Sequence, residues 1–333
     1  MNYINEAGTI VLPYIKYSKY ALDVYRDLNP EKFTNPLMIL PLFNSCLRVI
    51  ESKHNQNVAH IFLNDLGKEY IEPNKKVLLA FSGGLDSAYQ ALWLREQGYD
   101  VTLFHVKNMN YYTNGKEYQV VQDFATHFDF KVVYAEFKQN TKDGPYKKFW
   151  RENSFKNTLL YCMMYDYCIE NNISNISSGD DLRLDIKDTV VGTNVADAWQ
   201  VTAEFFKWLN IKYIGINGNT THGDSTIHKG IRLKLMKEKD AYDYFYSCVN
   251  PGRFNQSNHK RIENKFGVKL EKWNCGVCRK CAYHSLLRHY FLDEQFPREF
   301  VDFCWEKICN GADYEFFKPE LPLEKRIQNL YDY

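Results

Sequence analysis

The sequence predicts an α/β protein built on a doubly wound, mainly parallel sheet. From residue 76 onward, short apolar segments alternate with longer segments of mixed polarity, the pattern of strands followed by helices. Each return to a parallel strand requires a right-handed crossover, so helices are expected on both faces of the sheet. A glycine-rich turn directly follows the first apolar segment, and ligands of such sheets bind beyond the carboxyl ends of the strands.

Short apolar runs define the expected strands, and the segments between them define the helices. Gly98 is expected to end the first helix, because glycine commonly follows the last helical turn. Strands are expected over residues 77–81, 101–106, 131–135, 175–178 and 213–216, and helices over residues 87–97, 117–128, 157–170 and 195–208.

Three regions are expected along the chain. Residues 1–75 contain no chemical motif, and prolines interrupt a pattern that predicts a strand over 9–15 and helices over 17–27, 37–50 and 58–66. We interpret this region as a packing extension, with a docking module as the alternative. The sheet domain is expected over residues 76–245, and a cysteine knuckle followed by helices over residues 246–333.

Composition narrows the class of protein. Lys and Arg number 42 and Asp and Glu number 41, giving a net charge of +1, so no global attraction to nucleic acid or membranes is expected. No apolar run is long enough to span a membrane, and residues 1–15 contain no Lys or Arg, which argues against a secretory signal. Nine cysteines in such a chain favour a reducing cytoplasm, with metal or catalytic roles for thiols.

The turn after the first strand has the chemistry of a phosphate-binding loop. Its glycines permit close approach of the backbone to a ligand, and the first turn of the next helix offers unpaired N–H groups to an anion. The sequence contains neither a Walker A motif nor a correctly spaced G-x-G-x-x-G. An acidic residue in such a loop is expected to order it or to hold Mg²⁺ shared with the phosphates. The loop is Ser82-Gly83-Gly84-Leu85-Asp86-Ser87.

Four cysteines form a candidate metal site. Cys275, Cys278 and Cys281 follow the pattern C-G-x-C-x-x-C, and Cys248 lies upstream. Four thiolates suit tetrahedral Zn²⁺ in a closed structural site. C-x₂-C-x₂-C also begins some iron–sulfur ligand sets, which leaves a cluster as the alternative. His259 or His284 are alternatives to Cys248 as the fourth ligand.

The loop and the cysteine pattern together resemble a known family. The loop matches the SGGxDS motif of the PP-loop ATP pyrophosphatases, and the downstream Cys248 with C-G-x-C-x-x-C resembles the QueC branch, the 7-cyano-7-deazaguanine synthases. The resemblance covers roughly residues 77–293. It implies ATP, Mg²⁺ and Zn²⁺ as cofactors and a homodimer. The implied reaction is adenylation of the carboxylate of 7-carboxy-7-deazaguanine, attack by ammonia to form an amide, and dehydration to a nitrile.

The resemblance also implies roles for residues outside the loop. Lys156 stands where the family has arginine, and Lys cannot form the bidentate contact that Arg makes with phosphate or carboxylate. Lys229 keeps the lysine of a family stretch whose acidic residues are missing here. Lys156 and Lys229 are expected to neutralise phosphate or carboxylate, and Asp86 and Ser87 to act with them. Gly179 is expected at the nucleotide, and the substrate is expected to contact Asn157, Asp180, Asp181 and Asp197.

Three other functions stay open at this point. QueC-like proteins also resemble components of DNA-modification and phage-defence gene sets, where the acceptor is a protein or nucleic acid. A tRNA-thiolating PP-loop enzyme would need a reactive cysteine near ATP and a basic RNA-binding surface. A non-catalytic nucleotide-binding scaffold would not need every position of the loop. His222 is a further candidate, as a proton carrier in a loop.

Overall fold

The computed structural model describes the sheet, the loop after its first strand and most of the C-terminal region. The predictions for residues 1–70 and for the helix over 195–208 lie outside the described residues. The structure describes residues 71–107, 116–136, 160, 164, 167–179, 211–216, 229–246, 248, 256–309 and 318–332.

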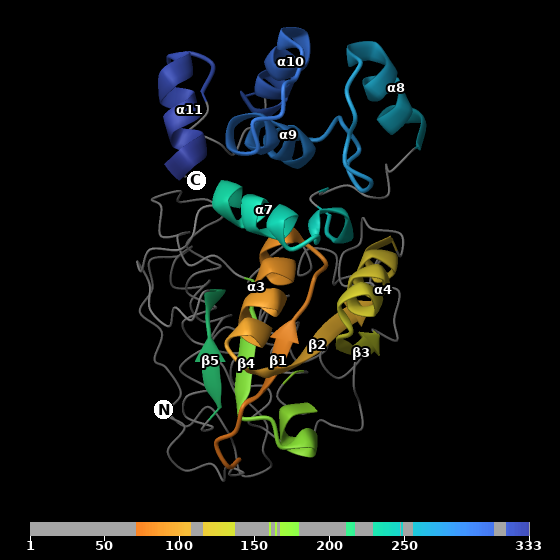
Figure 1. Ribbon diagram of the computed structural model, residues 1–333, viewed down its shortest axis with the longest axis vertical. Coiled ribbons are helices and arrows are strands. Elements are labelled where there is room, and N and C mark those ends of the chain that lie inside the picture. The colour runs from red at the N-terminus through yellow and green to blue at the C-terminus, as the bar shows by residue number, and fades with distance from the viewer. Residues whose placement is uncertain are drawn as a thin grey trace, which may run out of the picture.

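The described elements alternate between strand and helix up to β3, as the sequence predicts, and are helical from α7 onward (Figure 1). Their bounds are β1 Lys76–Ala80, α3 Leu85–Glu96, β2 Asp100–Lys107, α4 Lys116–Phe128, β3 Lys131–Glu136, β4 Asn175–Ser178, β5 Lys212–Ile214, α7 Lys229–Glu238, the 3₁₀ helix η5 Tyr242–Tyr244, α8 Gln256–Phe266, α9 Arg279–Phe291, α10 Arg298–Cys309 and α11 Leu323–Asp332.

The five described strands form one sheet in the order β3-β2-β1-β4-β5, and every pairing is parallel. The predicted parallel α/β sheet is therefore confirmed. The chain proceeds outward from β1 through β2 to β3 and then returns to place β4 on the other side of β1. The strand order thus reverses between β1 and β4, and ligands of open α/β sheets bind at such a switch point.

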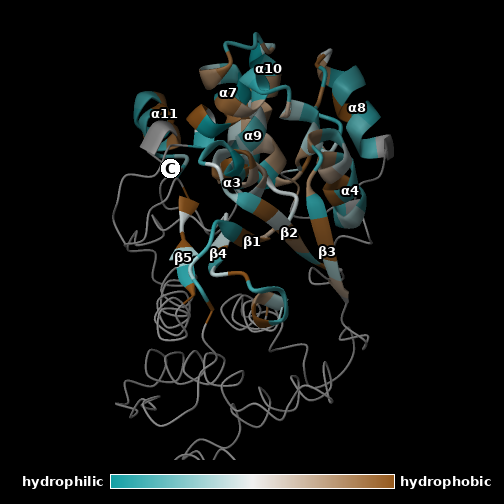
Figure 2. Cartoon of the chain, turned by 60° about the horizontal axis from the view of Figure 1, so that its bottom comes forward, coloured by the Kyte–Doolittle hydropathy of each residue, from teal (hydrophilic) through white to brown (hydrophobic). Residues whose placement is uncertain are grey.

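Both faces of the sheet are buried, which explains the apolar strands. Alternate residues of β1 and β2, among them Leu79 and Leu103, join the core beneath α3 and α4. Phe104 points to the opposite face, where its ring lies 6.2 Å from that of Tyr167, part of the helical segment that precedes β4. Figure 2 shows hydrophobic colours along β2 and β3 and mostly hydrophilic colours on α8 and α10.

Two predicted boundaries shift by two residues, and several others shift by one. Helix α3 begins at Leu85 rather than at residue 87, because Gly84 is extended and its carbonyl already accepts a hydrogen bond from Ala88 N–H at 3.0 Å. Strand β5 ends at Ile214 rather than at residue 216, because its pairing with β4 covers only three residues.

The C-terminal helices lie beyond one end of the sheet domain, with α7 between them and α3 (Figure 1). Helix α9 packs against both α7 and α10, and α7 contacts α3. The buried ring of Phe300 on α10 belongs to the same core cluster as Leu79 of β1, so the sheet and these helices share one hydrophobic core. Among the described residues, no helix has the length and apolar character needed to cross a membrane.

Candidate functional site

The loop after β1 has the geometry of an anion-binding turn. Gly83 has φ +80°, a conformation that side-chain-bearing residues rarely adopt, so glycine is required there. Gly84 is extended, and its N–H donates to Ser82 Oγ at 3.2 Å. Ser82 is exposed, whereas Ser87 is buried and its hydroxyl donates to the Gly84 carbonyl at 3.1 Å. The Ser82 hydroxyl is therefore the loop side chain most accessible to a ligand.

Gly179, directly after β4, packs against the first turn of α3. A Cβ atom at Gly179 would lie 2.5 Å from the backbone nitrogen of Ser87 and 2.8 Å from its Cα. No side chain fits at that separation, so glycine permits the end of β4 to contact the loop. The structure thus places Gly179 beside the loop, and its contact with a nucleotide stays a prediction.

Asp86 pairs with two cations of α7. Arg232 Nη1 donates to Asp86 Oδ1 at 2.6 Å, and Lys229 Nζ lies 3.5 Å from Asp86 Oδ2. The Arg232 side chain is fully buried, while those of Asp86 and Lys229 are about a quarter exposed. Burial alone would raise the pKa of Asp86, but the charges of Lys229 and Arg232 outweigh it and hold the pKa at about 2. These ion pairs join the first turn of α3 to α7, and both roles expected for Asp86 stay predictions.

The side chains of Asp86, Lys229 and Arg232 together carry a net positive charge at the first turn of α3. Lys229 and Arg232 bring two cations to one carboxylate, and the N-terminus of α3 adds the positive end of its dipole. Lys280, on the first turn of α9, belongs to the same group. Desolvation by the surrounding protein and the charge of Lys229 lower the pKa of Lys280, although part of its side chain is exposed. This arrangement is suited to a polyanion such as the phosphates of a nucleotide.

Tyr246 joins the loop to the cysteine region. Its N–H donates to the Gly83 carbonyl at 2.9 Å, and the residue forms a parallel β-bridge with Gly84. Its hydroxyl donates to Glu117, a buried carboxylate in the first turn of α4. The Tyr246 ring also packs against the cysteine cluster that contains Cys248.

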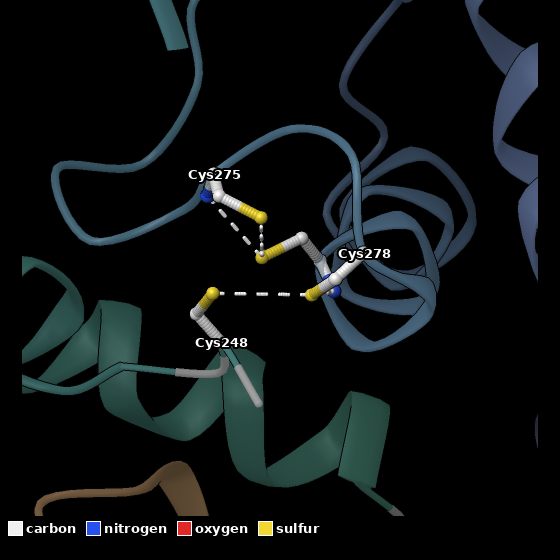
Figure 3. Close-up of side chains that lie close together, drawn as sticks. Cys248, Cys275 and Cys278 are labelled. Atoms are coloured by element: carbon white, nitrogen blue, oxygen red, sulfur yellow. Dashed lines mark hydrogen bonds between the residues drawn. The ribbon is translucent and has the colours of Figure 1, made fainter. Parts of the chain in front are cut away.

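The four predicted cysteines converge on one point (Figure 3). All four Sγ atoms lie within 4.8 Å of one another, with Cys248 Sγ 3.9 Å from Cys278 Sγ and Cys275 Sγ 3.7 Å from Cys281 Sγ. Metal–sulfur bonds of about 2.3 Å in a tetrahedron place the sulfurs about 3.8 Å apart, so the spacing fits four ligands of a single ion. The thiolates of an iron–sulfur cluster bind several irons and lie farther apart, so the geometry fits a cluster less well.

The N-terminus of α9 shapes this cluster. Cys278 is the N-cap of α9, and its sulfur accepts a hydrogen bond from Cys281 N–H at 3.5 Å. Hydrogen bonding from Cys248, and then from Cys275 and Cys281, lowers the pKa of Cys278. Cys278 is also the member of the cluster that is partly exposed, since the other three are buried.

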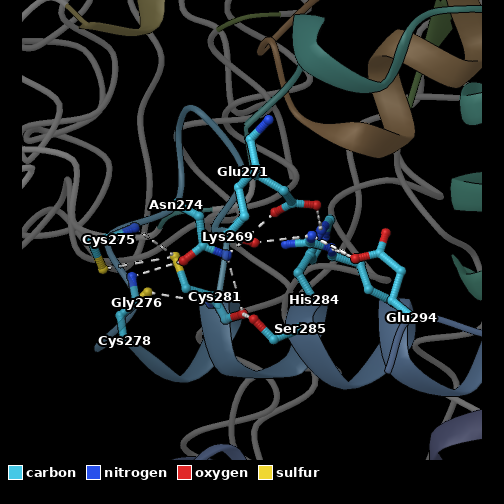
Figure 4. Close-up of polar contacts among 11 residues, drawn as sticks. Lys269, Glu271, Asn274, Cys275, Gly276, Cys278, Cys281, His284, Ser285 and Glu294 are labelled. Atoms are coloured by element: carbon cyan, nitrogen blue, oxygen red, sulfur yellow. Dashed lines mark hydrogen bonds and ion pairs between the residues drawn. The ribbon is translucent and has the colours of Figure 1, made fainter. Parts of the chain in front are cut away.

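A polar network supports the knuckle (Figure 4). The buried Asn274 accepts a hydrogen bond from Gly276 N–H at 2.7 Å, and its side-chain amide donates to the Cys281 carbonyl at 3.4 Å. His259 lies 2.7 Å from the Asn274 carbonyl, and His284 pairs with Glu271 at 3.8 Å. Neither histidine belongs to the metal-competent group, so Cys248 and not a histidine completes it among the described residues.

A second charged network lies along α9. Burial alone would raise the pKa of Glu271, but the adjacent His284, with the charge of Arg288, lowers it to about 2. Arg288 in turn forms a two-point contact with Glu294, at 3.0 and 2.6 Å. Glu271 is also hydrogen-bonded by Asn274 at 3.2 Å, so this network reaches the knuckle.

The structure brings together the loop, Gly179, Lys229 and the four cysteines. The remaining predicted residues lie outside the described part of the chain: Lys156, Asn157, Asp180, Asp181, Asp197 and His222. Sequence reasoning missed Arg232, Tyr246 and Glu117. Arg232 carried a weak signal, because it lies one helical turn after Lys229 on the same face of α7.

Comparison with known proteins gives one family match. Residues 75–167 match the family described as tRNA methyl transferase HUP domain. This supports placing the loop-bearing part of the chain among the PP-loop ATP pyrophosphatases, which are ATP-using enzymes, and does not single out the QueC branch. No curated protein matches the chain.

The similar solved structures include one that matches over the whole chain, but only weakly. It is the U34-tRNA thiolase NcsA from Methanococcus maripaludis with its [4Fe-4S] cluster, at 13% identity and a TM-score of 0.37, covering 100% of this chain and 93% of that chain. Likeness at this level carries no argument about the activity of this protein.

Proposed function

We propose that this protein is an ATP-dependent enzyme that adenylates an oxygen of its acceptor and releases pyrophosphate from the loop Ser82–Ser87. The observation that supports this most directly is the position of the loop. It lies at the switch point of the sheet, on the N-terminus of α3, with Lys229 and Arg232 beside it. Adenylation makes a poor leaving group, the acceptor oxygen, into a good one. Preorganised donors at the loop would stabilise the charge of the departing pyrophosphate.

The acceptor we propose is 7-carboxy-7-deazaguanine or a close analogue, with ammonia as the nucleophile. Support comes from the sequence, which combines the SGGLDS loop with Cys248 and C-G-x-C-x-x-C. In this reading Lys229 faces the phosphates or the carboxylate, and Lys156, Asn157, Asp180, Asp181 and Asp197 contact the substrate. Mg²⁺ would share the phosphates with the loop.

We propose Zn²⁺ for the four cysteines, because their mutual distances fit a single tetrahedral ion. Bound there, zinc would hold the segment of Cys248 to the start of α9. A closed set of four thiolates leaves no coordination position for substrate, so the ion would act on structure.

A second candidate is thiolation of a tRNA base, and one observation favours it. The cysteine cluster packs against Tyr246, which contacts the phosphate loop, and its partly exposed member Cys278 has a lowered pKa. A thiol near an adenylated carbon is what sulfur transfer requires. The net charge of +1 counts against a large RNA surface.

The test is pyrophosphate release from Mg-ATP by metal-loaded protein, with mass spectrometry of the products. One set of reactions contains 7-carboxy-7-deazaguanine and ammonium, and another contains tRNA and a sulfide donor. We expect release that depends on the deazaguanine acid, with an amide or nitrile product. Thiolated nucleosides in the second set would select the thiolase instead.

Ser82→Ala serves as the loop variant in these reactions. Removing one preorganised donor to the departing charge is expected to slow release about 100-fold. Release at the wild-type rate would contradict the assigned role of the loop. Absence of release under all conditions, with ATP bound, would leave a non-catalytic nucleotide-binding protein.

A further inference from the structure

The cysteine cluster and the phosphate loop are connected through a single residue, Tyr246. It lies between them in space, and Cys248 follows it by two positions in the chain. Tyr246 contacts the loop in two ways: its backbone N–H binds the Gly83 carbonyl, and its ring lies against Gly83. A Cβ atom placed on Gly83 would be 3.3 Å from Cε1 of that ring.

The backbone contact fixes the direction of a candidate phosphate donor. In a trans peptide the carbonyl and the following N–H point in opposite directions. Because the Gly83 carbonyl is bound to Tyr246 N–H at 2.9 Å, the Gly84 N–H of the same peptide must point away from Tyr246. It points at the exposed Ser82 hydroxyl, at 3.2 Å. Gly83, at φ +80°, has the conformational freedom of glycine, which would allow this peptide to rotate. The hydrogen bond with Tyr246 restricts that rotation.

The position of Tyr246 is itself set from two sides. Its hydroxyl donates to Glu117, which is buried on α4 and therefore rigidly placed. On the other side, its ring packs against the cysteine cluster, and Cys248 contributes one of the four sulfurs. An ion held by the four sulfurs would join Cys248 to the start of α9 and so would limit the movement of Tyr246.

We infer that Tyr246 is a positioning residue that couples metal binding at Cys248, Cys275, Cys278 and Cys281 to nucleotide binding at the loop. The inference rests on the proposed role of the loop in binding ATP. With metal bound, Tyr246 holds the Gly83–Gly84 peptide in the orientation that directs its N–H to Ser82 Oγ, and so keeps the exposed Ser82 hydroxyl in place for phosphate. Without metal, that peptide gains freedom, and part of the binding free energy is used to order it.

Coupling of this kind is reciprocal, which gives two independent measurements. Metal should tighten binding of a non-hydrolysable Mg-ATP analogue, measured by calorimetry on metal-loaded and metal-free protein. The same analogue should slow the extraction of metal by a coloured chelator. We expect about a tenfold gain in affinity for the nucleotide analogue, within the usual range for coupled sites, together with a slower extraction of metal whose factor the linkage does not fix. The second measurement uses the loaded protein throughout, so it does not depend on the folding of the metal-free chain.

Tyr246→Ala keeps the backbone N–H but removes the side chain that packs against both Gly83 and the cysteine cluster. It should bind both ligands and lose the coupling, so that the nucleotide analogue no longer slows metal extraction. Tyr246→Phe keeps the ring, loses only the hydroxyl contact with Glu117 and should retain most of the effect. Tyr244→Ala is the matched control: Tyr244 lies two residues away and stacks on His127 at 4.0 Å. It should behave as the wild type.

The outcomes separate the two proposals. If the loaded protein binds the analogue and the affinity is independent of metal and of Tyr246, the coupling is wrong and the proposed function stands. If the loaded wild-type protein binds no nucleotide, the proposed function fails and the coupling fails with it. Equal losses in Tyr246→Ala and Tyr244→Ala would also overturn the role of Tyr246.

Discussion

The phosphate loop and the cysteine cluster are neighbours, yet different interactions determine their shapes. The loop is positioned by the sheet: it follows β1, contacts the end of β4 through Gly179 and continues into α3. Among the described residues, none of the strands contributes a cysteine to the cluster. Four sulfurs from two segments meet at the start of α9, supported by the hydrogen bonds of Asn274.

The two sites should therefore be sensitive to different substitutions. Backbone conformation determines the shape of the loop, so a Cβ atom added at Gly179 or the loss of the Asp86 ion pair should disturb it. Side-chain chemistry defines the cluster, so the loss of one ligand should be enough to abolish it. Four predictions test this contrast, in decreasing order of the expected effect.

The largest effect should follow the loss of one sulfur ligand. Cys281→Ala should abolish tight metal binding and remove the associated stabilisation, about 4 kcal/mol at a metal concentration 1,000 times Kd. Cys304→Ala is the matched control, because Cys304 is equally buried but lies on α10 outside the cluster. Metal content and thermal unfolding with and without chelator measure both. Retention of one metal per chain by Cys281→Ala would contradict the four-cysteine site.

Asp86→Ala should leave the fully buried Arg232 without its carboxylate. Removing one partner of a buried pair costs about 3–5 kcal/mol, and the partial exposure of Asp86 places the expected value near the lower end, about 3 kcal/mol. Urea unfolding measures the free energy. Asp302→Ala breaks the exposed Arg298–Asp302 pair of α10 and should cost less than about 1 kcal/mol. Equal costs would show that Arg232 finds another acceptor.

Acid should weaken the same contact. The folded pKa of Asp86 is about 2, below its ordinary value of 3.8, so the stabilisation is fully present above pH 3.8 and is lost as the pH falls towards 2. The expected loss is about 2 kcal/mol. The free energy of unfolding is measured for wild type and Asp86→Asn between pH 5 and 2. The difference between the two proteins should become smaller as the pH falls. A constant difference would refute the lowered pKa.

Gly179→Ala should affect the loop through volume alone. Its Cβ would lie 2.5 Å from Ser87 nitrogen, so the end of β4 or the start of α3 must move, at a cost of about 1–2 kcal/mol. Gly267→Ala is the control: the site has open space for a Cβ atom, but its φ of +65° is strained for alanine. Its loss of stability should be similar to that of Gly179→Ala, with backbone strain rather than a steric clash as the cause. Only Gly179→Ala should weaken nucleotide binding, as measured by calorimetry.

Local sequence predicted much of the fold, because local properties determine it. Buried parallel strands are continuous apolar runs, and the glycine turn after residue 81 marks where the first one ends. The parallel sheet and strand 175–178 were therefore predicted correctly, and most of the other described boundaries shifted by one or two residues. Three cysteines at fixed spacing likewise predicted the knuckle, since metal ligands leave a distinct pattern.

The rest depends on contacts that no local pattern records. The partner of Asp86 is Arg232, 146 residues away, and α7 has no motif that singles out this arginine. Tyr246 is one of 25 tyrosines, and its contacts with the loop and with Glu117 arise only from the tertiary fold. Such residues could be found only after β1, α4 and α7 had been placed relative to one another.

The return of the chain to place β4 beside β1 has a consequence for folding. Asn74 hydrogen-bonds Ser174 across 100 residues, at 2.8 Å, so pairing of these strands closes a long loop and is expected to be slow. A nascent chain ending at residue 170 would carry the complete Ser82–Ser87 sequence yet lack Gly179, Arg232 and Tyr246. We expect such a chain to bind no nucleotide. During synthesis, the chain would then acquire affinity for ATP only after β4 has paired with β1.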